Sequence, residues 1–157
     1  MPKASSRGLA CPAAPGPARE FFPGGTHLRL GLEEIDRQHE QIRRLLNRLH
    51  AACVTADPAA WRPVFEQLGA AVKKHFRFEE RLMRRYGDPA LAGHKARHES
   101  LLERAADLSA AVRRGTVIDE PVLLYLKGWL RDHVLGPDAR MAAFLRRASR
   151  KELDTWR

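Results

Sequence analysis

The sequence predicts an all-α protein, an antiparallel up-down four-helix bundle with a disordered N-terminal tail. Four long segments carry apolar residues at alternating steps of three and four, which is the spacing of the buried seam of a bundle. Turn signals rich in proline and glycine separate these segments by short connections, which favours antiparallel neighbours. The strict alternation of apolar and polar residues that is typical of strands does not occur.

The turn signals place the helices in order along the chain. Asp57-Pro58 and Asp88-Pro89 each pair a capping carboxylate with a proline that suits the first helical position. Gly115 ends the third segment, Asp119 to Pro121 opens the fourth, and Gly136-Pro137 is expected to close it. These signals predict helices near 32–54, 58–86, 89–114 and 120–135, with a short helical continuation over about 138–150.

The chain of 157 residues is long enough for one domain with a real core. We expect a Pro/Ala-rich flexible tail over 1–26, the bundle over 27–150 and a C-terminal tail over 151–157. No stretch approaches the roughly 20 apolar residues of a membrane span. The two cysteines, Cys11 and Cys53, make a poor disulfide pair, which favours a reducing, cytoplasmic location.

The chain is basic, with a formal net charge of +9 from 28 basic and 19 acidic residues. This charge could attract an acidic protein partner. An arginine-rich surface explains the same excess without any partner, and charge runs are weak signals. Nucleic acid is not an expected partner, because no recognised binding motif and no interleaved aromatic platform accompany the charge.

The most informative feature is a set of ionisable residues at seam positions that normally carry leucine. Each pair of neighbours in one segment is four residues apart and projects from one helix face, and the last carboxylate follows the last histidine by five residues. Isolated ionisable groups in a core are costly, so pairing or metal coordination is needed. The seven residues are His39, His75, Glu79, His94, His98, His133 and Asp138.

Five imidazoles with two carboxylates favour a metal site over ionic pairing. Mixed ligands of this kind suit iron, manganese, zinc or copper, but not calcium. Seven ligands exceed one zinc tetrahedron and suit two metals bridged by carboxylates. The Glu-x-x-His motif of ferritin-like di-iron proteins is absent. Because a histidine-rich site has little negative charge to stabilise high-valent iron, we interpret it as a two-iron site that binds dioxygen.

At this point the chain resembles the hemerythrins, in particular the single-domain bacterial kind. The resemblance runs from about Leu28 to Phe144 and keeps the order of the motifs. Its parts are Ile35-Asp36-Arg37-Gln38-His39, the run from His75 to Met83, His94-x-x-x-His98, Trp129-Leu130-Arg131-Asp132-His133 and finally Asp138. The departures are Phe21-Phe22 where the family often has an upstream tryptophan, Gly136-Pro137 before the aspartate, and Met141-Ala142 where aromatic residues often follow it.

The resemblance implies roles for these residues. One iron would take His94, His98 and His133, and the other would take His39 and His75, with a position left open for dioxygen. Glu79 and Asp138 would bridge the two irons (Fe2+ or Fe3+) together with an oxo or hydroxo group. Trp129 and Leu130 would line the oxygen pocket, although core packing explains Trp129 nearly as well.

Three functions remain compatible with this set of residues. The first is a non-enzymatic protein that binds dioxygen reversibly for storage, for delivery to an oxygen-consuming enzyme, or for sensing. The second is a di-iron oxidoreductase that acts on peroxide or nitric oxide with an external electron donor. The third is an iron or redox sensor whose metal state controls a contact with a partner.

Overall fold

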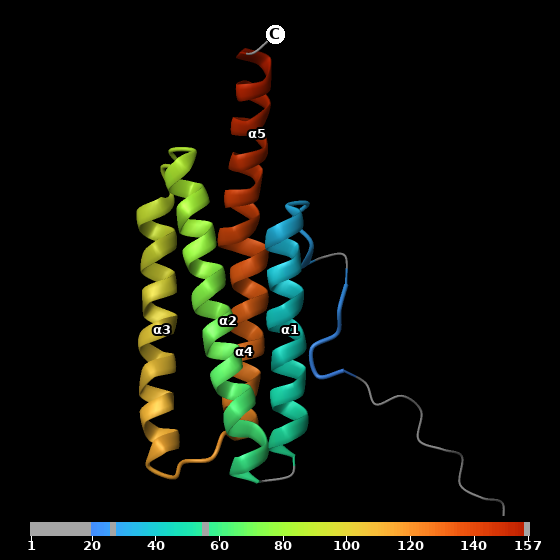
Figure 1. The fold of residues 1–157 in the computed structure, drawn as a ribbon, viewed down its shortest axis with the longest axis vertical. Coiled ribbons are helices and arrows are strands. Elements are labelled where there is room, and N and C mark those ends of the chain that lie inside the picture. Colours follow the sequence, from blue (N-terminus) through green and yellow to red (C-terminus); the bar gives the residue numbers. More distant parts are fainter. Residues whose placement is uncertain (1–19, 26–27, 55–56, 156–157) are drawn as a thin grey trace, which may run out of the picture.

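The chain forms an all-α, up-down bundle in which the first four helices alternate in direction and the last continues the fourth (Figure 1). The computed structural model describes residues 20–25, 28–54 and 57–155, with side chains through residue 149. Within these ranges no strand is present, and no helix is long and apolar enough to cross a membrane. The elements are α1 (Glu33–Cys53), α2 (Pro58–Arg85), α3 (Leu91–Arg113), α4 (Glu120–His133), the π-helix η2 (Val134–Asp138) and α5 (Ala139–Thr155).

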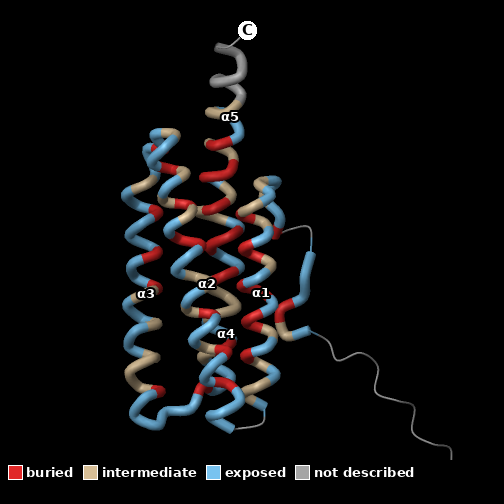
Figure 2. The backbone as a smooth tube through the Cα atoms, in the orientation of Figure 1, coloured by how far each residue is buried: buried red, intermediate tan, exposed pale blue. Residues whose placement is uncertain are grey.

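The predicted seams form the core, and buried positions follow the sides where the helices meet (Figure 2). The larger apolar cluster includes Leu46, Leu49 and Trp61, each at most 2% exposed. A smaller cluster at the other end of α1 includes Ile35 and Met83. The ionisable seam residues lie between the two clusters along α1 and α2, so the apolar core closes both ends of the polar centre.

Side chains at the turns set the helix starts. Asp57 accepts a hydrogen bond from the Ala59 backbone N–H at 2.9 Å, and Asp119 accepts one from the Val122 N–H at 3.1 Å, as N-caps do. Asp88 instead accepts from the Ala90 N–H at 2.9 Å within the turn. Helix α3 therefore begins at Leu91, two residues after the start predicted from Asp88-Pro89.

Gly136-Pro137 does not end the fourth helix, and that prediction is wrong. The chain passes through η2 directly into α5, and α4, η2 and α5 form one continuous column (Figure 1). In an α-helix the ring of Pro137 would meet the carbonyl of residue 133, whereas the wider i→i+5 turn of a π-helix relieves that clash. The predicted continuation over 138–150 is longer, and α5 extends to Thr155 through most of the range expected as a C-terminal tail.

The π-turn also sets where Asp138 points. Five residues span more than one turn of α-helix, so His133 and Asp138 would face different directions in a regular helix. The i→i+5 repeat brings them onto the same face. The His133 Nε2 and Asp138 Oδ1 atoms lie 3.0 Å apart. The extra residue of the π-turn, and not an end of the helix at Gly136-Pro137, therefore brings Asp138 toward the centre.

The segment Glu20–Gly25 lies against the bundle, although it falls within the predicted tail of 1–26. Phe22 is 4% exposed, and its backbone N–H donates to Asn47 Oδ1 at 2.7 Å. The Phe22 carbonyl accepts from Asn47 Nδ2 at 3.0 Å and from the Arg43 guanidinium at 2.6 Å. Part of the predicted tail, residues 20–25, is thus packed against the bundle, and residues 1–19 lie outside the described part.

We expect Phe22→Ala to lower the free energy of unfolding by about 3 kcal/mol, because it empties a buried aromatic position. Urea unfolding of the full chain, followed by circular dichroism, measures this change. Glu20→Gln is the matched control, because Glu20 is exposed and the change removes the charge of its ion pair with Arg43 but keeps an oxygen that can accept from the Gly24 N–H. We expect it to change stability by at most about 1 kcal/mol. Equal stability of the Phe22→Ala variant and the wild type would show that the segment does not contribute to the core.

Candidate metal centre

The structure brings all seven predicted site residues together in the middle of the bundle. Each element supplies its residues from the face that its apolar seam turns inward. All seven are buried, with exposed fractions between 0 and 5%. The contributors are His39 from α1, His75 and Glu79 from α2, His94 and His98 from α3, His133 from α4 and Asp138 from η2.

The seven residues form two overlapping groups that share both carboxylates. In each group, one nitrogen or oxygen atom per residue lies within 4.8 Å of every other. The two groups are Glu79, His94, His98, His133 and Asp138, and His39, His75, Glu79 and Asp138. Two adjacent cations held by two common carboxylates would fit this arrangement, with three imidazoles on one side and two on the other.

The carboxylate oxygens are divided between the two groups. Glu79 Oε1 lies 3.4 Å from His75 Nε2, whereas Glu79 Oε2 lies 3.3 Å from His94 Nε2 and 3.3 Å from His98 Nε2. Glu79 therefore offers one oxygen to each group.

Asp138 repeats this division. Its Oδ2 atom lies 3.3 Å from His39 Nε2, and its Oδ1 atom lies 3.0 Å from His133 Nε2 and 3.4 Å from His94 Nε2. Both carboxylates therefore have the disposition of bridging ligands. The five Nε2 atoms all face the same interior space.

Two histidines are oriented by polar side chains behind them. His75 Nδ1 lies 3.1 Å from Gln38 Oε1, and Gln38 in turn donates to Glu34 at 2.6 Å. His98 Nδ1 lies 3.0 Å from Glu80 Oε1. An Nδ1–H that donates to such an acceptor leaves the Nε2 lone pair free for a metal.

Sequence reasoning missed Gln38 and Glu80, because each lies one position off a seam and looks like a surface residue. The signal available in the sequence was the position of each residue next to a predicted ligand. Each of them directly neighbours a seam ligand, His39 or Glu79, and can reach a histidine of the adjoining helix.

Aromatic rings cover the three-histidine side. The ring of Phe76 stacks on His98 with centroids 3.6 Å apart and an interplanar angle of 4°. The half-buried ring of Trp129 stacks on His133 with centroids 4.5 Å apart and an angle of 15°. These contacts fix the planes of two imidazoles and keep water away from them.

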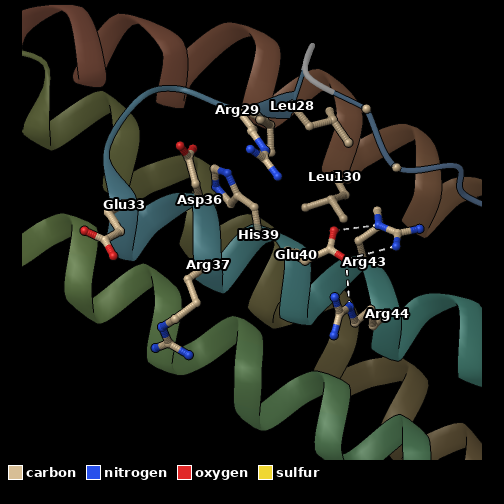
Figure 3. Close-up of a pocket in the computed structure, with 13 residues that line it drawn as sticks. Leu28, Arg29, Glu33, Asp36, Arg37, His39, Glu40, Arg43, Arg44 and Leu130 are labelled. Atoms are coloured by element: carbon tan, nitrogen blue, oxygen red, sulfur yellow. Dashed lines mark hydrogen bonds and ion pairs between the residues drawn. The ribbon is translucent and has the colours of Figure 1, made fainter.

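A pocket reaches the two-histidine side from the surface (Figure 3). Its volume is about 640 Å³, and Leu28, His39, Leu130 and Val134 are among its lining residues. Leu130 is 7% exposed and lies on the same side of the centre as His39. Trp129 does not line this pocket, but it shares with Leu130 a separate, mainly apolar cavity of about 340 Å³ between the helices.

Burial sets the protonation of the histidines. It lowers the pKa of His75 from 6.5 to about 3, with the nearby His39 as the second cause. Burial also lowers the pKa of His98 to about 2 and lowers the pKa of His94. These three imidazoles are therefore neutral at pH 7, which is the form that binds a metal.

The pKa values of the two carboxylates shift in opposite directions. Burial and then the charge of Asp138 raise the pKa of Glu79 well above its usual value. Burial acts to raise the pKa of Asp138 too, but the imidazoles of His133 and His39, which lie beside its oxygens, outweigh burial and lower that pKa. Two buried carboxylates that repel each other this strongly fit a site that a cation neutralises.

The donor atoms themselves test whether metal ions fit. Glu79 Oε1 and both carboxylate oxygens of Asp138 are buried without a hydrogen bond. A buried polar atom without a partner costs about 1–3 kcal/mol, and more when it is charged. Cations at the centre would satisfy these atoms and the facing Nε2 lone pairs together, so the residues fit a pair of metal ions.

The lowered pKa of His75 predicts how the stability of the metal-free protein depends on pH. Its folded pKa lies below the unfolded value, so between pH 6.5 and 3 the unfolded state binds more protons and the stability falls as the pH falls. The glutamine side chain of His75→Gln does not titrate. We therefore expect its free energy of unfolding to rise relative to that of the wild type by about 1.4 kcal/mol for each pH unit below pH 6.5. Urea unfolding of both metal-free chains between pH 7 and 4.5 measures this, and parallel curves would contradict it.

Comparison with known proteins identifies a family. The family model described as "Hemerythrin HHE cation binding domain" matches residues 30–145. A bacteriohemerythrin of Stenotrophomonas maltophilia is 35% identical over 115 residues, which are 73% of this chain and 75% of that protein. A bacteriohemerythrin of Pseudomonas aeruginosa is 32% identical over 112 residues, covering 71% and 73% of the two chains.

Solved structures agree on the fold. A wild-type hemerythrin matches with a TM-score of 0.70 and 27% identity over 72% of this chain and 88% of that chain. A hemerythrin with a single substitution matches with a TM-score of 0.77 and 23% identity, covering 80% of this chain and 98% of that chain. The family match spans well over half of the sequence and includes the whole buried histidine–carboxylate centre, and the chain belongs to the hemerythrin family.

Proposed function

We propose that this protein holds two iron ions between its helices and binds dioxygen reversibly, without turnover. The observation that carries the proposal is the division of the oxygens of Glu79 and Asp138 between a three-histidine group and a two-histidine group. Bound iron would supply electrons to dioxygen and take them back on release. The two relatives described above are named bacteriohemerythrins, which supports this choice among the metals that the donor set allows.

The ligand assignment follows the two groups. His94, His98 and His133 would hold one iron, His39 and His75 would hold the other, and the two carboxylates would bridge them together with an oxo or hydroxo group. Because one iron has one protein ligand fewer, the open position falls on the side of His39. The stacked ring of Trp129 and the bond between Glu80 and His98 keep the three-histidine side fixed.

Access to the open position supports the same assignment. The pocket of about 640 Å³ is lined by His39 and by the apolar side chains of Leu28 and Leu130 (Figure 3). Dioxygen is small and apolar, so it passes such side chains more easily than water or protons do. Trp129 and Leu130 would line the oxygen route at the apolar cavity that they share. Reversible binding of this kind would serve storage, sensing or delivery to an oxygen-consuming enzyme.

The deciding experiment is the visible spectrum of the anaerobic, ferrous-loaded chain while dioxygen is added and then removed. We expect charge-transfer bands that appear and disappear reversibly, with two irons per chain. Irreversible conversion to a bridged ferric spectrum would overturn reversible binding and favour a redox enzyme or sensor. Iron that does not bind at two per chain would overturn the metal assignment itself.

His133→Ala tests the ligand assignment. We expect it to lower the iron content below two per chain and to abolish stable dioxygen binding, because it removes an imidazole that faces both His98 and Asp138. His50→Ala is the control, since His50 stacks on Phe21 away from the centre and its loss should leave iron unchanged. Iron analysis and the visible spectrum provide the readouts, and a wild-type result for His133→Ala would refute its role.

Leu130→Ala tests the apolar barrier beside His39. We expect two irons per chain as in the wild type, but autoxidation faster by roughly tenfold, which corresponds to about 1.4 kcal/mol off the barrier. The cause is easier entry of water into the pocket that Leu130 lines. The decay of the oxygenated spectrum gives the rate, and an unchanged rate would refute the barrier.

A further inference from the structure

A groove between α3 and α4 leads to the three-histidine side of the centre, away from the pocket beside His39. It has a volume of about 750 Å³, and Trp129 and His133 are among its lining residues. Small residues such as Gly93, Ala96 and Gly128 keep the two helix surfaces low along it. The groove therefore exposes an aromatic ring that is in stacking contact with a proposed iron ligand.

The groove combines unpaired positive charge with exposed apolar surface. Arg97 and Arg104 line it, and among the described residues neither forms an ion pair. On the α4 wall, Leu124 is 50% exposed and Tyr125 is 42% exposed, and the Arg104 guanidinium of α3 lies 5.7 Å from the Tyr125 ring centroid. The one acidic side chain in the lining, Asp132, is already paired with Arg131 at 2.8 Å.

The other polar routes from the centre to the surface differ in charge. The chain of hydrogen bonds behind His75 ends at Glu34, and the one behind His98 ends at Glu80, so both end in carboxylates. In the pocket beside His39, Arg37 is paired with Glu34. Arg43 and Arg44 are both paired with Glu40, whereas Arg29 has no ion pair among the described residues. The α3–α4 groove differs in combining two arginines without an ion pair, exposed apolar side chains and an aromatic ring stacked on an iron ligand.

We propose that a small acidic electron-transfer protein docks in the α3–α4 groove and that electrons reach the centre through the Trp129 ring stacked on His133. This inference rests on the proposed di-iron function. Redox encounters use small interfaces, and complementary charge speeds such encounters more than it strengthens them. Two carrier molecules each lose one electron and the two ferric ions each gain one, so the protein forms and breaks no covalent bond. The groove would thereby return an autoxidised protein to its dioxygen-binding state.

The test uses a reduced plant-type [2Fe–2S] ferredoxin as the acidic one-electron carrier and the full diferric chain as acceptor, in stopped flow. The groove variant is Arg97→Glu with Arg104→Glu. The matched control is Arg77→Glu with Arg84→Glu, which changes the net charge equally on an exposed face of α2. We expect the groove variant alone to lose about tenfold or more in second-order rate and most of the salt dependence. Equal rates for the two double variants would overturn the proposal.

Two further measurements separate this inference from the proposed function. Dithionite should reduce two irons per chain at the same rate in both double variants, and failure to reduce any iron would count against the di-iron centre. Docking is measured without iron, by titrating ferredoxin into the metal-free chain and following the Trp129 indole resonance. Binding that the groove variant retains would overturn the docking site. If the wild type is a dimer and the groove variant is a monomer, the proposal is also overturned, because a second copy then occupies the groove.

Trp129→Leu tests the electron route itself, since it keeps an apolar side chain but removes the ring that stacks on His133. Because Trp129 also lines the groove, the dissociation constant of ferredoxin is measured first and the rates are compared at saturation. The transfer rate at saturating ferredoxin should fall severalfold. A wild-type saturating rate would show that electrons enter elsewhere.

Discussion

Two carboxylates with no exposed surface, Glu79 and Asp138, face the same small space in the middle of the bundle. Burial and the charge of Asp138 raise the pKa of Glu79, whereas the neighbouring His133 and His39 lower the pKa of Asp138. In a core built only for stability such a pair would be replaced by apolar residues, because an uncompensated buried charge is costly. Much of the surrounding architecture is arranged to present five imidazoles to these two groups. The fold holds these two carboxylates in a buried site that five histidines surround.

That constraint explains the irregular turn in the last helix. Asp138 must face the centre together with His133, while Met141 and Leu145 must stay in the apolar cluster beyond it. A regular α-helix cannot satisfy both requirements with this spacing, and one π-turn does. The π-turn also accommodates Pro137 without breaking the helix. A local departure from ideal geometry therefore lies at the functional centre, where such turns are often found.

The sequence predicted the features that depend on periodicity. The three- and four-residue spacing places His39 between Ile35 and Ile42 on one face, and the same argument applies to each histidine of the seams. Features that depend on tertiary contacts were not predictable. Gly136-Pro137 has the composition of a helix end. The π-turn that it forms instead depends on packing further along the chain, which the local sequence does not reveal. Phe22 has no periodic neighbours, so nothing local indicated that Asn47 and Arg43 would hold its backbone.

The centre is also asymmetric in a way that its ligand list alone does not reveal. The two-histidine side meets a pocket in which three of four arginines are paired and Leu28, Leu130 and Val134 are apolar lining residues. The three-histidine side is covered by stacked rings and lies next to a groove with unpaired arginines. A neutral gas and a charged redox partner need opposite surroundings, since one is favoured by dry apolar walls and the other by exposed charge. One buried centre can meet both needs only if its two faces differ. The uneven distribution of five histidines over two positions provides that difference.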